Sequence, residues 1–331
     1  MSELTSEVPL DGTAVDLRPR HTDAPVLLES SLGLVLVLGA AALWGTTGTA
    51  SMLIPDGTSL APQTFGFFRL IIGAPLLICA VLLTSNGSWT SLERRHLPLT
   101  ALFGAMVALY QIGFFFSVKY VGITVGTLVS TGTTPIFAAV LAVLLLRERL
   151  SYALVLALLT AIVGTVCFIG LPTHTVPETD LSLLGIGFGL VAGAAFAVVT
   201  ITGRVLARRS APPMIFTAVG FMVGASILLP FASDECVEVL SNWHIWPVLL
   251  YLGAASTALA YILYVSGIRR VRTATAGAAA TLAEPGIATF LAFAVVGERL
   301  QALDWMGAIL LLAALILLLY SEASATSSPG G

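Results

Sequence analysis

The stretch TTPIFAAVLAVLLLRERL at residues 133–150 has a counterpart 150 positions later, AEPGIATFLAFAVVGERL at residues 283–300. Each copy places a proline thirteen residues before a Glu-Arg-Leu tripeptide, and the two copies align without a gap. Matches of Ala and Leu carry little weight in an apolar chain, whereas a shared proline and tripeptide are informative. The pattern therefore predicts an internal duplication.

The composition of the 331-residue chain is that of a membrane protein. Hydrophobic residues make up 57% of it and charged residues 10%, and its mean hydropathy is +0.98. A domain of this size with such a composition would not stay dissolved in water. The 15 Lys and Arg residues are scattered rather than gathered into a stripe, so we expect no nucleic acid as a partner.

Ten apolar stretches are long enough to cross the hydrocarbon layer of a bilayer, which takes about 20 residues. They cover residues 34–54, 64–84, 97–117, 123–146, 151–169, 182–203, 214–231, 246–266, 273–296 and 303–320. We therefore expect an all-α integral membrane protein with ten transmembrane helices.

The basic residues predict the orientation of these helices, because Lys and Arg collect in short cytoplasmic loops. With the N-terminus inside, Lys119 and Arg299 lie outside and Arg69 lies within a helix. The other twelve basic residues are cytoplasmic: Arg18, Arg20, Arg94, Arg95, Arg147, Arg149, Arg204, Arg208, Arg209, Arg269, Arg270 and Arg272. We expect cytoplasmic N- and C-termini and a place in the inner (plasma) membrane.

If a unit of five helices is duplicated, the two copies enter the membrane from opposite sides, because five crossings end on the side opposite to the start. We therefore expect two inverted repeats, at residues 32–170 and 182–321. Residues 1–31 and 322–331 are polar or rich in small residues, and we expect them to be disordered tails. Inverted repeats supply two nearly equivalent conformations, which is the physical basis of alternating access in secondary transporters.

The two repeated segments, with LWG at residues 43–45 and FFRLIIGAPLLI at residues 67–78, resemble the EamA family of the drug/metabolite transporter superfamily. The resemblance spans residues 34–320. It implies a ten-helix permease with cytoplasmic termini, a central cavity, and peripheral fifth and tenth helices. It also implies a protein that mainly exports amino acids, related metabolites or toxic compounds, and it fixes the fold better than the cargo.

Glu284 is the first candidate for substrate binding or coupling, because it lies at the centre of the ninth expected helix. A charged carboxylate there costs about 2.5–3.5 kcal/mol on insertion scales, so hydrocarbon favours its neutral form. Protonation during part of a cycle would suit a coupling proton, and a charged carboxylate would equally suit an amine or a cation. A structural role beside Pro285, which leaves a carbonyl without its usual donor, is the alternative.

Arg69 lies in the outer half of the second expected helix. It either binds cargo, or it snorkels outward or pairs with a carbonyl at a helix end. We expect Pro135 and Pro285 to break their helices near the middle and to free carbonyls toward the interior. Thr134, in a cluster of hydroxyl residues before Pro135, would offer its hydroxyl to a zwitterion or satisfy its own helix.

Three further residues are candidates for the wall of the same space. Trp44 lies at the centre of the first helix, away from the interfacial belts where Trp usually collects, and it either faces a cavity or packs. Gln111 and Tyr261 are 150 positions apart, so they are equivalent residues of the two repeats near mid-membrane. Their amphipathic side chains would suit a cavity that holds a small molecule.

Glycines in the sixth and seventh helices follow a spacing of four residues that permits close helix contact. They are Gly185, Gly189 and Gly193 in the sixth helix and Gly220 and Gly224 in the seventh. The spacing fits packing within one chain or a contact in a homodimer.

The motifs of the competing protein classes are missing from the sequence. It contains no HExxH, no G-x-S-x-G, no Walker A motif and no CxxC pair, so we expect neither an enzyme, nor an ATP-driven pump, nor a metal or cofactor. We expect a secondary active transporter, most simply an exporter of small metabolites such as amino acids or amines. An importer or exchanger of the same fold, and less readily a channel, are the alternatives.

Overall fold

The structure is a computed structural model that describes residues 24–54, 60–84, 92–146, 152–169, 179–270 and 273–327. Within these ranges all the regular structure is helical. The elements are α1 (Ala24–Ser51), α2 (Pro62–Thr84), η2 (Arg94–His96), α3 (Leu97–Leu146), α4 (Tyr152–Ile169), α5 (Thr179–Arg208), α6 (Pro213–Ser241), α7 (Trp246–Leu250), η3 (Tyr251–Leu259), α8 (Ala260–Ile268), α9 (Thr273–Leu291), η4 (Ala292–Val296) and α10 (Ala302–Ser327).

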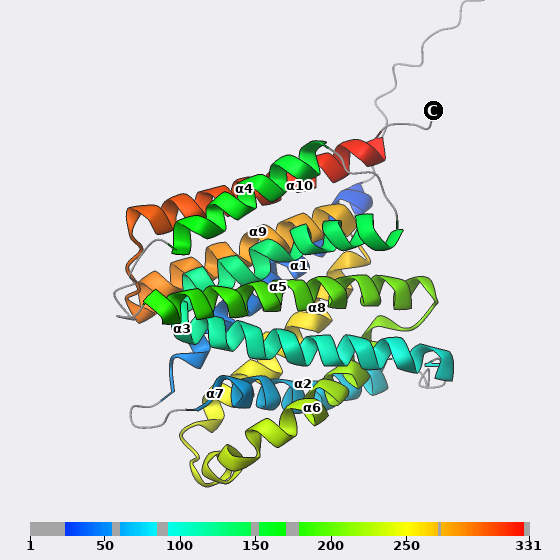
Figure 1. Cartoon of the computed structure of the whole chain (residues 1–331). Helices are drawn as coiled ribbons and strands as arrows, with labels where there is room; N and C mark the ends of the chain where they lie inside the picture. Colours follow the sequence, from blue (N-terminus) through cyan, green and yellow to red (C-terminus); the bar gives the residue numbers. More distant parts are fainter. Residues whose placement is uncertain are drawn as a thin grey trace, which may run out of the picture.

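The longest element, α3, is two membrane crossings joined at one glycine. Its 50 residues would measure about 75 Å as a straight helix, more than twice the hydrocarbon thickness. Gly122 has a φ of 84° and a ψ of 173°, and there the chain reverses, so that the second half of α3 runs back toward the end where the first half began (Figure 1). A Cβ on Gly126 would lie 2.9 Å from the backbone nitrogen of Val118, across the reversal. The short gap between the stretches expected at 97–117 and 123–146 is therefore a reversal at Gly122.

Ten crossings are present in the described residues when α3 is counted as two. The elements α7, η3 and α8 follow one another without a break and form one crossing, and α9 with η4 forms another. The helices that open the two halves of the chain, α1 and α5, run in opposite directions (Figure 1). The predicted all-α architecture of two inverted halves is confirmed.

Three helix ends differ from the expected ones by seven residues or more. Helix α1 begins at Ala24, inside the segment expected to be a disordered tail, and α10 continues to Ser327. Helix α6 was expected to end at residue 231, but it continues to Ser241 through Asp234, Glu235 and Glu238. Charged residues end the apolar stretch but not the helix, because the helix satisfies its own backbone groups beyond the hydrocarbon as well. Residues 1–23, 55–59, 85–91, 147–151, 170–178, 271–272 and 328–331 lie outside the described part.

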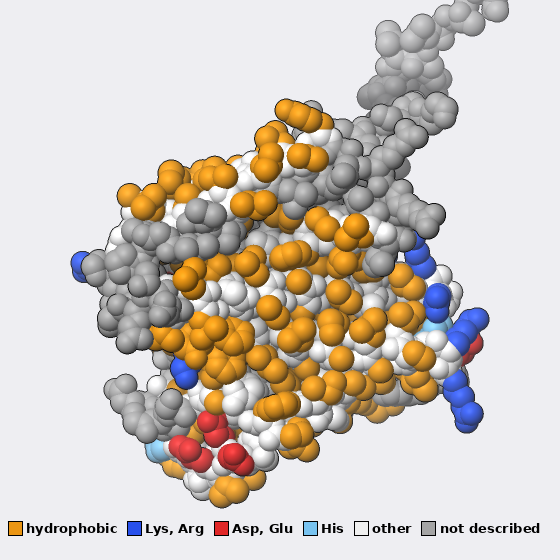
Figure 2. Space-filling view, in the orientation of Figure 1, with side chains coloured by type: hydrophobic (Ala, Val, Ile, Leu, Met, Phe, Trp, Pro, Cys, Tyr) orange, Lys and Arg blue, Asp and Glu red, His pale blue; other side chains and the backbone are white. Residues whose placement is uncertain are grey.

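Charged side chains mark the two ends of the bundle, and apolar side chains cover the face between them (Figure 2). We call one end the basic end; its residues lie at the ends of α5 and α8 and at the start of α3, and they are Arg94, Arg95, Arg208, Arg269 and Arg270. We call the other the acidic end, after the three carboxylates of α6. The apolar belt between the two ends has the surface that a bilayer requires.

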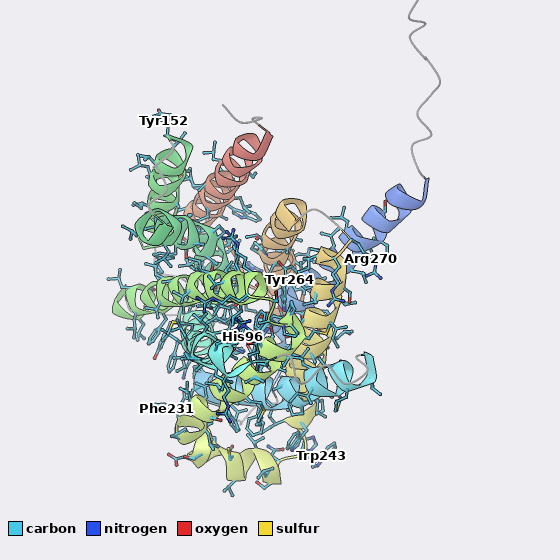
Figure 3. All side chains as sticks on the ribbon, turned by 90° about the vertical axis from the view of Figure 1, so that its right-hand side faces the viewer. His96, Tyr152, Phe231, Trp243, Tyr264 and Arg270 are labelled. Carbon is cyan, nitrogen blue, oxygen red and sulfur yellow. The ribbon has the colours of Figure 1, made fainter. Side chains whose placement is uncertain are left out.

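Helices α4 and α10 pack on each other at the edge of the bundle (Figures 1 and 3). Figure 3 looks onto the basic end, where His96 and Arg270 lie, and it shows Tyr152 of α4 at the outer edge. On α4, Leu159 and Ile162 are exposed, as lipid-facing side chains would be. The fifth and tenth crossings are thus peripheral, as the family resemblance implied.

The glycines of α5 face α3 of the same chain. A Cβ on Gly185 would lie 2.7 Å from the Cβ of Tyr120, and one on Gly189 would lie 2.9 Å from the Oγ of Ser117. In α6, a Cβ on Gly224 would lie 2.9 Å from Leu70 of α2. These glycines let helices approach closely within the chain, and a homodimer remains a prediction.

Candidate functional site

Arg69 is buried in the middle of the bundle and is held by uncharged acceptors. Its side chain is only 6% exposed. Nε donates to Thr257 Oγ1 at 2.7 Å, one terminal nitrogen donates to Gln111 Oε1 at 3.3 Å, and the other donates to the carbonyl of Ser256 at 3.3 Å. The guanidinium group therefore points inward, and the snorkelling expected as an alternative is wrong.

Glu284 of α9 lies within electrostatic range of Arg69, and so do Tyr110 and Tyr261. Glu284 is half-buried. Among the described side chains, none forms an ion pair with Arg69 or with Glu284. Opposite charges inside a bilayer normally pair with each other, so a guanidinium bonded to uncharged acceptors with a carboxyl group in electrostatic range is unusual.

Aromatic side chains close the site on the side of α1. The indole of Trp44 packs edge-on against Tyr261 with 5.4 Å between ring centroids, and it also contacts Tyr264 at 5.3 Å. A Cβ on Gly45 would lie 2.8 Å from the backbone oxygen of Glu284, so α1 and α9 touch here. Tyr264 lies among the helices in Figure 3, whereas Phe231 and Trp243 lie at the outer edge. Trp44 thus borders the charged cluster.

A cavity of about 20 Å³ lies against this cluster, with room for about one water molecule. Its wall includes Arg69, Gln111, Tyr110, Thr257 and Tyr261. This volume is too small to hold a metabolite. The arrangement is that of a closed site.

The short π-helix η3 supplies two of the three acceptors that hold Arg69. Thr257 Oγ1 also donates to the carbonyl of Leu252, five residues earlier, at 2.8 Å, and Ser256 Oγ bonds Thr47 of α1 at 3.0 Å. π-Helical turns often lie at functional sites, because they re-aim side chains. The sequence reasoning missed Ser256 and Thr257, although two adjacent hydroxyl residues within an apolar helix were a usable signal.

Thr134 is not part of this cluster. Its hydroxyl donates to the carbonyl of Ser130 at 2.9 Å and to that of Gly193 in α5 at 3.3 Å. This is the alternative in which the hydroxyl bonds backbone carbonyls of the helices rather than a bound molecule. Pro135 and Pro285 lie inside helices that continue past them, so the expected helix breaks are not found. A membrane helix tolerates the one lost hydrogen bond when neighbouring groups satisfy the carbonyl, and the backbone of α3 leaves helical geometry at Gly122 instead.

The second Glu-Arg-Leu tripeptide has a structural role. The Oε2 atom of Glu298 accepts from the backbone N–H of Thr124 at 3.1 Å and from its Oγ1 at 2.8 Å. The first N–H groups of a helix have no partner within it and favour a negative charge nearby. Glu298 therefore caps the helix that begins after the reversal at Gly122.

Among the described residues, no three His, Cys, Asp or Glu side chains lie close enough together to hold a metal ion. The groups gathered at the site are instead a guanidinium, a carboxyl group, hydroxyl groups and aromatic rings.

A model of the EamA-like transporter family matches residues 31–170 and 183–320 of the chain. The chain belongs to this family. The uncharacterized transporter YwfM of Bacillus subtilis is 32% identical over 300 residues, which cover 88% of this chain and 95% of YwfM. The threonine/homoserine exporter RhtA of Salmonella typhimurium is 26% identical over 276 residues, 74% of this chain and 91% of RhtA. A crystal structure with 19% identity shares the fold, with a TM-score of 0.60 over 90% of this chain and 99% of its own.

In this EamA-like transporter, both matched stretches contribute to the charged cluster. Arg69 and Gln111 come from the first stretch, and Thr257, Tyr261 and Glu284 come from the second. Transporters with inverted repeats commonly bind substrate at the repeat interface near the bilayer midplane. The position of the cluster agrees with that rule.

Proposed function

We propose that this transporter is a secondary active exporter of small metabolites that carry an amine, such as amino acids, and that it works by alternating access. The observation that carries the proposal is a pair of opposite charges within the bundle, the buried Arg69 and the half-buried Glu284, in electrostatic range of each other but not in an ion pair among the described residues. The guanidinium would bind a carboxylate and Glu284 would bind an ammonium group. The aromatic rings of Trp44 and Tyr261 would contact the apolar portion of the same cargo.

Export from the cytoplasm is the direction that we favour. The relative RhtA is named an exporter of threonine and homoserine, and both are zwitterions that would match two opposite charges. We place the basic end in the cytoplasm of the inner (plasma) membrane, because Lys and Arg resist translocation. Both termini would then be cytoplasmic, and import or exchange by the same fold is the alternative.

Counterflow in liposomes tests the proposal without a guess about the driving ion. Purified protein is reconstituted into vesicles preloaded with one unlabelled amino acid, amine or cationic dye, and uptake of the labelled compound is followed. We expect saturable exchange for zwitterionic amino acids and none in protein-free vesicles. Passive ion leakage without exchange of any compound would contradict a carrier and favour a channel.

Replacing Glu284 by glutamine is expected to abolish accumulation driven by a pH gradient while counterflow continues at a reduced rate. Glutamine keeps the size and the hydrogen-bonding capacity of the side chain but can no longer take up or release a proton. Arg69 of α2, Tyr110 of α3 and Tyr261 of α8 are the groups that interact electrostatically with Glu284. The measurement is labelled-substrate accumulation with and without an imposed pH gradient.

The matched control is Glu238→Gln, which removes a carboxylate from the acidic end of α6, far along the helix from the cluster. We expect its gradient-driven accumulation to stay within about twofold of the parent protein. Gradient-driven accumulation that persists in Glu284→Gln would exclude Glu284 as the coupling group.

A further inference from the structure

A second cavity opens at the acidic end of the bundle. Its volume is about 240 Å³, and it lies between the end of α1, the start of α2 and the first half of α3. Ser51, Pro62 and Lys119 line it near the end of the bundle, and Phe65 and Phe115 line it at its inner side. We call this cavity the vestibule, and unlike the central cavity it has room for a small metabolite.

The vestibule and the central cavity follow one another along the same two helices. On α2, Phe65 lies one turn from Arg69, and on α3, Phe115 lies one turn from Gln111. One turn of four residues is about 6 Å along a helix axis. Since Arg69 and Gln111 line the central cavity, the two phenylalanines stand between that cavity and the vestibule.

These two rings stack on each other. Their centroids are 5.4 Å apart and their planes differ by 25°. Phe65 is 8% exposed and Phe115 is 3% exposed. Next to them α2 and α3 are in close contact, since a Cβ on Gly66 would lie 2.8 Å from the Cβ of Gln111.

We propose that the stacked pair of Phe65 and Phe115 is the gate through which cargo passes between the central cavity and the vestibule. The proposal rests on the transport function proposed above, and it names the two side chains that must part on the acidic side. A stacked pair suits a gate, because rotation of the two rings opens the path without breaking hydrogen bonds in the backbone of either helix. It also leaves the bonds that hold Arg69 in place.

The test measures access to the central cavity and needs no cargo. Cys79 and Cys167 are replaced by serine, and Gln111→Cys places a thiol at the cavity wall. Vesicles receive a membrane-impermeant maleimide on the side of the acidic end, and labelling at each position is read by peptide mass spectrometry. The native Cys236, which lies near the acidic end of α6, reports how much of the protein faces the reagent.

We expect Phe65→Ala and Phe115→Ala each to raise the labelling rate at position 111, relative to that at Cys236, by about tenfold or more. The matched control is Phe67→Ala on the same helix, because Phe67 is also 8% exposed but lines neither cavity. That variant should leave the labelling rate within about twofold of the parent.

Unchanged labelling in both gate variants would overturn the proposal, and so would an equal increase in Phe67→Ala, which would indicate general loosening. Phe65→Leu and Phe115→Leu keep most of the packed volume, and they give the answer if an alanine variant does not fold; an intermediate labelling rate is expected for them. Because labelling needs no substrate, a failed gate and a failed transport function give different results.

Discussion

Replacing Arg69 by lysine is expected to lower counterflow exchange by about 100-fold. The guanidinium bonds Thr257, Gln111 and Ser256 at once, and a single ammonium group cannot reach three partners in this planar arrangement. Hydrogen bonds of charged groups contribute about 1.5–3 kcal/mol each, so the loss of one or two of them accounts for that factor. Initial exchange rates in liposomes, normalised to the amount of reconstituted protein, are the measurement.

Arg95→Lys is the matched control for this substitution. Arg95 lies at the basic end with a side chain that is 65% exposed, in an ion pair with Glu93. Exposed pairs of this kind contribute little, so its exchange rate should stay within about twofold of the parent rate. Normal exchange in Arg69→Lys would show that positive charge alone is enough at this position, and the defined geometry would then have no role in binding.

Replacing Gly122 by alanine is expected to destabilise the protein by about 3 kcal/mol, through backbone strain and a steric clash together. A φ of 84° with a ψ of 173° belongs to a region that is essentially restricted to glycine. A Cβ there would also meet the carboxylate of Glu298. Thermal unfolding in detergent should show a midpoint about 4 °C lower than that of the parent protein.

A double-mutant cycle with Glu298→Ala separates the two causes. In that background the steric clash is absent, so Gly122→Ala should cost only the backbone strain, about 1–3 kcal/mol. Equal costs in the two backgrounds would show that the carboxylate moves aside freely. No cost in either background would contradict the reversal of the chain at Gly122.

The repeated proline and Glu-Arg-Leu segments were sufficient to predict the fold, because duplication, hydrophobic length and an odd number of crossings leave few arrangements. Gln111 and Tyr261 were predicted as equivalent residues of the two repeats, and the structure places both at the wall of the central cavity. Their equivalence was visible because the offset is constant through the chain.

The partners of Arg69 could not be predicted from the sequence. They depend on which faces of α3 and η3 turn toward α2, and the apolar pattern is nearly uniform around these helices, so it does not identify a face. For the same reason Thr134 was expected near a cargo, whereas its hydroxyl bonds two backbone carbonyls. The length of α6 was missed because three carboxylates in ten residues are typical of a loop in a membrane protein.

The cap that Glu298 places on Thr124 has a consequence for biosynthesis. The first half of the chain emerges from the ribosome many seconds before residue 298 is made, since synthesis proceeds at about 5–20 residues per second. Until then the crossing that starts after Gly122 has its first N–H groups uncapped. The nascent first half thus gains this stabilising contact only near the end of translation. A chain truncated before residue 298 would lack the contact, and we expect quality-control proteases to degrade it preferentially.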